Sequence, residues 1–205
     1  MTKIRHLLAI IFLAMLVGYY GPPLSAQSLN YDVSEPVFLI KQPKDNACWA
    51  TVATMMKSWK SKQLLSIDAV LEAADKASGG SYSATYRLDS GLSSSDKPGF
   101  LRAVGLRAEP PASYTPQAIE SKLRLWGPLW VTTAEPSGAR FSIHARMVIG
   151  IMGDGSATGT TLVVVDPSDG AKHIESFDSF VKKTEVLAKA DYGSNADVRP
   201  LIVHF

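Results

Sequence analysis

Apolar side chains recur at helical spacing in several segments of the first two thirds of the chain. A suitable helix start at 45–46 precedes apolar positions that follow the i, i+3, i+4, i+7 pattern: Trp49, Val52, Ala53 and Met56. The same spacing predicts a second helix over 66–77 and a short one from Phe100 to Gly105. Thr115-Pro116, an N-cap followed by a first-turn proline, predicts a further helix that ends near 126–127.

The pattern changes after residue 128. Runs rich in β-branched and apolar residues cover 129–131, 141–152 and 160–165, and glycine-containing turns separate them, with a strong turn at 153–155. A final helix is expected over 176–190 and a terminal strand over 201–205. Helices first and an antiparallel sheet afterwards indicate an α+β protein.

One stretch between the helices lacks a clear period. Residues 78–99 are rich in glycine and serine and include Gly79-Gly80, three consecutive serines and Pro98-Gly99. We expect a long irregular connection here, and such connections tend to be functional or mobile.

The N-terminus has the three-part layout of a secretory signal peptide. Lys3, Arg5 and His6 are followed by an apolar run over 7–17 and by Leu24-Ser25-Ala26, which ends in a small residue. The alternative is an uncleaved membrane anchor, but a run of 11 residues is shorter than the roughly 20 that span a bilayer. We therefore expect residues 1–26 to be removed, and a secreted or periplasmic protein of residues 27–205 with no stable membrane anchor.

Charge argues against nucleic acid as a partner. Without Lys3 and Arg5, the 21 basic residues of the chain fall to 19, which equals the 19 acidic ones. The two signs are well mixed, so there is no basic surface of the kind that binds nucleic acid or an anionic membrane.

Cys48 is the only cysteine of the chain. An intramolecular disulfide, a Cys-x-x-Cys zinc site and an iron–sulfur cluster are therefore excluded, and no cofactor is expected. Cys48 falls in the first turn of a predicted helix, where free N–H groups and the helix dipole lower the pKa of a thiol. A buried structural cysteine is the alternative, and the position of Cys48 alone leaves both open.

The neighbours of Cys48 favour catalysis. Gln42 precedes it by six residues, and Cys48-Trp49-Ala50 follows the loop 43–47. This segment resembles the papain family of cysteine peptidases, in which a glutamine at this spacing lies beside the nucleophile. The resemblance implies that the Gln42 amide and the Cys48 backbone N–H form an oxyanion hole. Plant-type members of the family have Cys-Gly-Ser directly before the nucleophile, whereas this chain has Asp45-Asn46-Ala47. This difference indicates a resemblance to a bacterial branch of the family.

A thiol nucleophile requires an imidazole partner. His144-Ala145 opens an apolar strand that ends in Gly150, which resembles the segment of the papain-like catalytic histidine. His173 follows a turn and His204 lies at the tail, and both are expected to be surface or packing residues. A polar residue on a half-buried strand is the alternative for His144. Arg146, on the same strand face, is expected either to shape a subsite or to point to solvent.

A candidate for the third residue of a catalytic triad with Cys48 and His144 follows the next predicted strand. Asp166 begins Asp166-Pro167-Ser168-Asp169-Gly170, where papain-like enzymes place the residue that orients the histidine. A carboxylate there would hold His144 in one tautomer. An Asp-Pro turn explains the same residue structurally, and Asp169 is the nearby competitor.

The resemblance covers about residues 36–185 and is closest to the papain-like peptidases of bacterial avirulence effectors. It implies a helical lobe over about 36–126, carrying the Cys48 helix, and a β lobe over about 127–205, carrying His144 and Asp166. The implied function is an exported endopeptidase that acts on proteins or peptides. The alternatives are an amidase or acyl-transferase with the same triad, on cell-wall or glutamine substrates, and a non-catalytic binding module. Residues 27–36 are too few for an inhibitory propeptide, so control by delivery or by an inhibitor or immunity protein is a further hypothesis.

Overall fold

A computed structural model describes residues 28–137, 140–193 and 199–205. The segment predicted to be a signal peptide lies outside these ranges. The helices of the described residues are α2 (Cys48–Ser61), α3 (Ile67–Ser78), α4 (Tyr82–Arg87), α5 (Lys97–Ala103), α6 (Pro116–Trp126) and α7 (Phe177–Gly193). The strands are β1 (Leu29–Asp32), β2 (Arg107–Ala108), β3 (Leu129–Ser137), β4 (Arg140–Gly153), β5 (Thr160–Asp166), β6 (Ala171–Ser176) and β7 (Ile202–His204).

The strands form one antiparallel sheet in the order β2-β7-β3-β4-β5-β6, and β1 pairs with the end of β4. On one side β4 pairs with β3 along Arg140–Val148. On its other side β4 pairs with β5 only from Met147 to Gly153. The edge of β4 around residues 144–146 therefore has no β5 partner. The last residue of β5, Asp166, lies beside this free edge.

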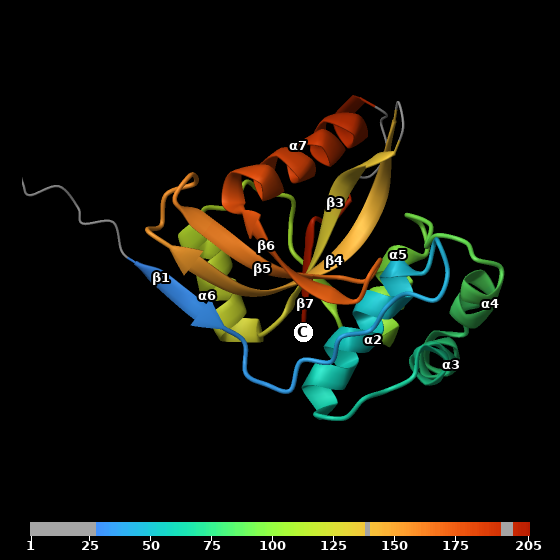
Figure 1. Ribbon diagram of the computed structural model, residues 1–205. Coiled ribbons are helices and arrows are strands. Elements are labelled where there is room, and N and C mark those ends of the chain that lie inside the picture. The colour runs from blue at the N-terminus through green and yellow to red at the C-terminus, as the bar shows by residue number, and fades with distance from the viewer. Residues whose placement is uncertain (1–27, 138–139, 194–198) are drawn as a thin grey trace, which may run out of the picture.

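Helices lie on both sides of the sheet (Figure 1). α7 crosses the sheet on one side, where it packs against β3, β5 and β6. α2 to α5 form a group at one end, with α2 against β3 and β4, whereas α6 packs against β1, β3 and β4. Among the residues placed by the structure, no helix is both long and apolar enough to cross a bilayer.

The mixture of helices and antiparallel sheet agrees with the predicted α+β class. The helix that carries the predicted apolar positions is confirmed, but it begins at Cys48 and not at 45–46. The cap at Thr115 is also confirmed, because its side chain accepts the Ala118 N–H. The prediction of an irregular connection over 78–99 is wrong in part, because α4 lies within it and α5 begins at Lys97, with Pro98 in its first turn. The strand β6 was not predicted, since its side chains alternate little and most of them are exposed.

Candidate active site

Cys48 is the first residue of α2. No side chain caps this helix end, so the N–H groups of the first turn remain available to an anion. The backbone N–H groups of Trp49 and of Ala145 lie near the Cys48 sulfur and help to lower the pKa of the thiol. The thiol therefore lies between the start of α2 and the free edge of β4.

His144 and Asp166 meet at the same free edge. Val165 is the last β5 residue before Asp166 and pairs with Met147 of β4, three residues after His144. His144 Nε2 lies 2.8 Å from Asp166 Oδ1, and both side chains are mostly buried. Because Nε2 faces the carboxylate, Nδ1 is the ring nitrogen left for the Cys48 thiol, which is close enough to His144 that the two groups shift each other's pKa.

These contacts favour a charged pair. Burial disfavours the imidazolium, but the hydrogen bonds to Asp166 and Cys48 and the negative charges of these partners raise the pKa of His144 to about 9. Burial likewise disfavours the thiolate, but the hydrogen bond to His144, the N–H groups and the imidazolium charge lower the pKa of Cys48 below its ordinary value.

Asp166 is ionised under the same influences. Burial opposes its charge, yet the hydrogen bonds from His144 and Ser168 hold the pKa of Asp166 well below its usual range. The Ser168 N–H donates to Oδ1 at 2.8 Å, so this oxygen accepts from both the imidazole and the turn. The three pKa shifts therefore all favour the charged forms, thiolate, imidazolium and carboxylate.

Gln42 lies at the start of the loop that leads to α2. Its backbone N–H donates to Pro167 O at 2.7 Å, which joins this loop to the turn that begins with Asp166. Its side-chain Nε2 donates to Lys44 O at 2.8 Å and to Asp45 O at 2.9 Å. Its Oε1 is buried and has no hydrogen-bond partner among the described residues. The loop carbonyls thus set the orientation of the amide.

Gly170 allows the two loops to approach each other. It adopts a φ of +72°, and a Cβ there would lie 2.8 Å from the backbone nitrogen of Lys41, next to Gln42. A side chain at this position would push the Gln42 loop away from the Asp166 turn.

The competing residues have other partners. Asp169 Oδ2 lies 2.8 Å from His173 Nε2, and Asp169 Oδ1 accepts the Ala171 N–H, so Asp169 serves the turn. His173 is half exposed on β6. His204 is buried against the Trp126 ring, with ring centroids 3.5 Å apart, and contacts Glu109 at 3.1 Å. Both histidines thus have the surface and packing positions expected of them.

Of the two alternatives for Arg146, the one in which its side chain points to solvent is wrong. Only 4% of the residue is exposed. Its Nη1 donates to Glu175 Oε2 at 2.6 Å and its Nε to Thr133 Oγ1 at 3.1 Å. Lys183 of α7 joins Glu175 and Glu135 in the same cluster. Because Thr133 is the cross-strand neighbour of His144, this neutral ion cluster fixes α7 over the strand that carries the histidine.

Lys97 is a charged neighbour that sequence reasoning missed. Its Nζ donates to Thr132 Oγ1 and Pro200 O, both at 3.3 Å, and thereby links α5 to the sheet. Burial lowers the pKa of Lys97 to about 8, the Arg199 charge acts in the same direction, and the Cys48 charge opposes both. The ammonium therefore favours the thiolate. The glycine- and serine-rich composition around Lys97 offered no signal for this contact.

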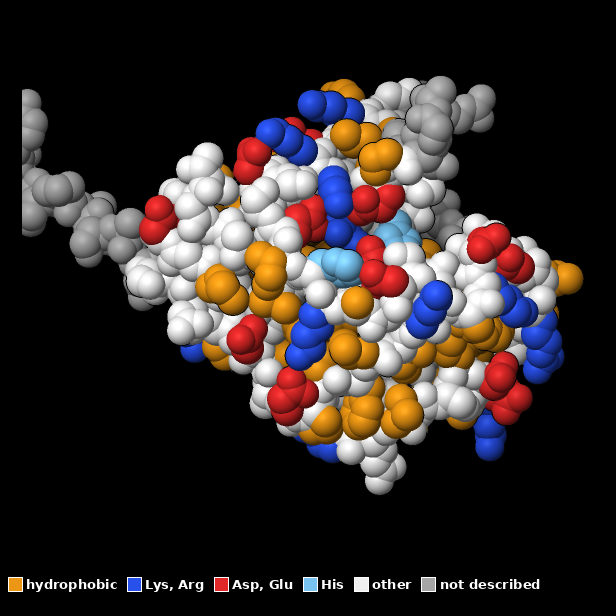
Figure 2. Space-filling model, viewed as in Figure 1, with side chains coloured by type: hydrophobic (Ala, Val, Ile, Leu, Met, Phe, Trp, Pro, Cys, Tyr) orange, Lys and Arg blue, Asp and Glu red, His pale blue; other side chains and the backbone are white. Residues whose placement is uncertain are grey.

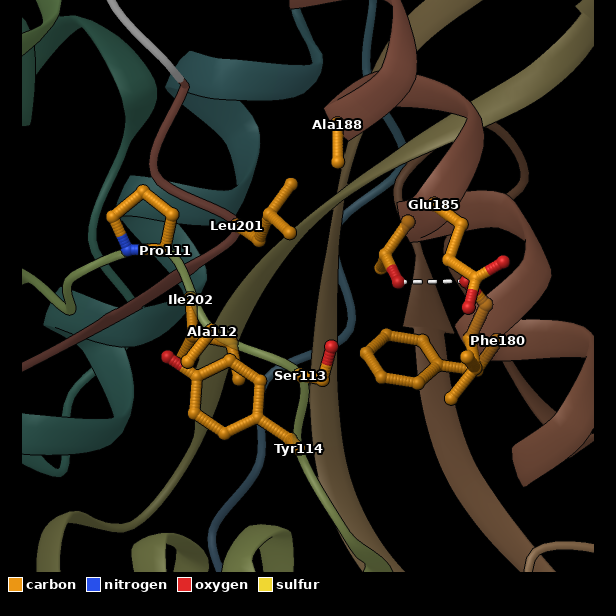
Figure 3. A pocket seen from close by; sticks show the side chains of 11 residues that line it. Pro111, Ala112, Ser113, Tyr114, Phe180, Glu185, Ala188, Leu201 and Ile202 are labelled. Carbon is orange, nitrogen blue, oxygen red and sulfur yellow. Dashed lines mark hydrogen bonds between the residues drawn. The ribbon is translucent and has the colours of Figure 1, made fainter. Parts of the chain in front are cut away.

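One face of the molecule presents both charged and apolar side chains (Figure 2). Figure 2 shows histidine side chains near the middle of one face, next to clustered acidic and basic side chains. An apolar pocket of about 290 Å³ lies elsewhere, between α7 and the segment from Pro111 to Tyr114 (Figure 3). None of Gln42, Cys48, His144 and Asp166 lines it, so the pocket is separate from the candidate site.

Comparison with known proteins gives a family. A search of curated proteins finds no match. The family model described as papain-like cysteine protease AvrRpt2 matches residues 27–185, which is most of the chain and includes all four candidate residues. The resemblance to the avirulence-effector branch is therefore confirmed, and the chain belongs to the AvrRpt2 family of papain-like cysteine proteases.

Proposed function

We propose that this chain is an exported cysteine endopeptidase in which Cys48 is the nucleophile, His144 the acid and base, and Asp166 the residue that orients His144. The observation that carries the proposal is the hydrogen bond between His144 and Asp166 at the free edge of β4, with Cys48 close enough to His144 that the two groups shift each other's pKa. Family membership supports peptidase activity in general, and this geometry supports the roles of the individual residues.

Acylation follows from the charged pair. The Cys48 thiolate attacks the carbonyl carbon of the scissile peptide bond, and the carbonyl oxygen becomes an oxyanion. The His144 imidazolium then gives its Nδ1 proton to the leaving amine as the C–N bond breaks. The products of this step are a thioester on Cys48, a free amine and neutral His144.

Deacylation returns the enzyme to its starting state. Neutral His144 removes a proton from water as the oxygen attacks the thioester carbon. The Cys48 thiolate leaves, the acyl group departs as a carboxylic acid, and His144 is again an imidazolium. Asp166 keeps the ring in one orientation through both steps and stabilises its charged form.

The oxyanion is stabilised by the Cys48 backbone N–H and the Gln42 amide in this proposal. The Gln42 NH₂ group has two hydrogens and donates to the carbonyls of Lys44 and Asp45. If these carbonyls share one hydrogen in a three-centre bond, the other is left for the oxyanion. Such a donor is worth about 3–4 kcal/mol of activation free energy.

The test is hydrolysis of a peptide library by the purified chain from residue 27, with Cys48→Ala as control. Cleavage at internal peptide bonds by the wild type and none by Cys48→Ala is expected. Cleavage that persists in Cys48→Ala would refute the role of the thiol. Release of ammonia from glutamine substrates without peptide cleavage would favour the amidase or acyl-transferase alternative.

Export and its consequences belong to the same proposal. Cleavage after Ala26 would leave Gln27 as the N-terminus, and mass spectrometry of the exported protein tests this. Recovery of exported protein that retains residues 1–26 would count against a cleaved signal peptide. Control by a partner predicts that an inhibitor or immunity protein co-purifies with the enzyme from its host, and full activity of the isolated chain in that host would contradict it.

A further inference from the structure

The segment that ends α4 is bound closely to the loop in front of Cys48. Asn46 N donates to Asp89 Oδ1 at 2.9 Å, and Asn46 Nδ2 donates to Asp89 O at 2.9 Å. Lys44 Nζ donates to the carbonyls of Tyr86 and Arg87 at 3.1 and 3.0 Å. These contacts join segments that are about forty residues apart in the chain and involve both backbone and side chains.

Asp89 occupies a position where glycine is usual. Its φ is +51°, and it directly follows Leu88, the last residue associated with α4. The Asp89 N–H bonds to Tyr86 O and the Ser90 N–H to Thr85 O, which is the hydrogen-bond pattern of a Schellman helix end. A left-handed conformation brings the Cβ of a non-glycine residue too close to the backbone and is therefore unfavourable. Asp89 therefore adopts a costly conformation that glycine would adopt freely, and its carboxylate reaches Asn46.

One peptide group connects this carboxylate to Gln42. The N–H of the peptide between Asp45 and Asn46 donates to Asp89 Oδ1, and the C=O of the same peptide accepts from Gln42 Nε2 at 2.9 Å. Because a peptide group is planar and rigid, fixing its N–H also fixes the direction of its carbonyl. Hydrogen bonds in such a series also polarise one another.

We propose that Asp89 is a positioning residue for the oxyanion hole, and that it acts on the Gln42 amide through the Asp45–Asn46 peptide. This inference rests on the proposed function, since it assigns Gln42 its role at the oxyanion. The carboxylate holds the peptide, the peptide carbonyl holds the Gln42 NH₂ group, and the amide is thereby oriented before substrate binds.

The test compares Asp89→Gly with Asp89→Asn in the full mature chain. Asp89→Gly keeps the left-handed backbone without strain and removes the acceptor, whereas Asp89→Asn keeps an acceptor oxygen and tolerates the same φ. We expect Asp89→Gly to lower kcat about 10- to 100-fold, because a misplaced donor loses most of its transition-state stabilisation. KM and the rate of Cys48 alkylation should stay close to wild type, and Asp89→Asn should restore most of kcat.

A double substitution separates this role from a general effect on folding. In a Gln42→Ala background, Asp89→Gly should cause little further loss, because the two residues act on one interaction. Asn46→Ala, which keeps the peptide N–H, should be milder than Asp89→Gly, and the exposed Glu72→Ala in α3 should match wild type.

The outcomes are distinct. The role of Asp89 would be overturned if Asp89→Gly had the kcat of the wild type, or if Asp89→Gly lowered kcat by the same factor in the Gln42→Ala background as in the wild type. A greater loss of kcat in Asn46→Ala than in Asp89→Gly would also overturn it. Each of these results would leave the proposed function intact. Absence of Cys48-dependent hydrolysis in the wild type would overturn the proposed function, and this inference with it.

Discussion

Replacement of Asp166 tests the charged pair most directly. The structure places the carboxylate 2.8 Å from His144 Nε2 and raises the pKa of His144 from its ordinary 6.5 to about 9. At about 1.4 kcal/mol per pKa unit, this difference corresponds to roughly 3 kcal/mol in favour of the imidazolium. Asp166 supplies part of this energy and Cys48 supplies the rest.

The sign of the pH effect follows from the protonated form of His144. Activity needs the imidazolium, so kcat/KM should fall as pH rises through about 9, the pKa of His144. Without the carboxylate charge, burial still disfavours the imidazolium, so the pKa of His144 must fall. We expect the alkaline limb of the pH–rate profile to move down by about one pH unit or more in Asp166→Asn and in Asp166→Ala.

The two variants differ in what they keep. An amide oxygen in Asp166→Asn can still accept the imidazole N–H and the Ser168 N–H, so measurable activity should remain. Asp166→Ala leaves the ring free to rotate and its N–H unpaired, at a cost of about 1–3 kcal/mol, so its rate should be much lower. Initial rates from pH 5 to pH 10, with folding checked by circular dichroism, provide the assay.

Asp169→Ala is the matched control, because its carboxylate contacts His173 and not His144. It should behave nearly like wild type. An unchanged alkaline limb in Asp166→Ala would refute the electrostatic reasoning. A greater loss of activity in Asp169→Ala than in Asp166→Ala would show that Asp166 is not the residue that orients His144. The roles of Cys48 and His144 would be unaffected by that result.

Three further predictions concern the same site. Iodoacetamide should label Cys48 quickly below pH 7 and more slowly in His144→Ala, and labelling that rises only near the free-thiol pKa of about 8.5 would contradict the ion pair. Gln42→Ala should lower kcat about 10²–10³-fold with nearly unchanged alkylation, because the amide acts on the intermediate, and equal losses in both assays would instead indicate a structural role. Gly170→Ala should destabilise the fold by about 1–2 kcal/mol or more in denaturant titration, because it adds strain at φ +72° and crowds Lys41, and an unchanged midpoint would argue against the close approach of the two loops.

The sequence alone determined the elements with a strong local period and the chemistry of single residues. The helix from Cys48 was predictable because apolar spacing and a free helix end are local properties. The family was recognisable because Gln42, Cys48, His144 and Asp166 follow one another in a fixed order with characteristic neighbours. The antiparallel sheet followed from β-rich runs separated by turns.

The tertiary structure decided what depends on contacts between distant segments. The stop of β5 pairing at Met147 creates the free edge where Cys48, His144 and Asp166 meet. The buried partners of Arg146 come from β3, β6 and α7, so a charged residue on a strand gave no sign of its burial. Asp89 lies in a segment whose glycine- and serine-rich composition predicted only a loop. The Asp89 carboxylate is linked to the Gln42 amide through the Asp45–Asn46 peptide group. Every residue has such a backbone group, so the identity of the side chains did not reveal the link.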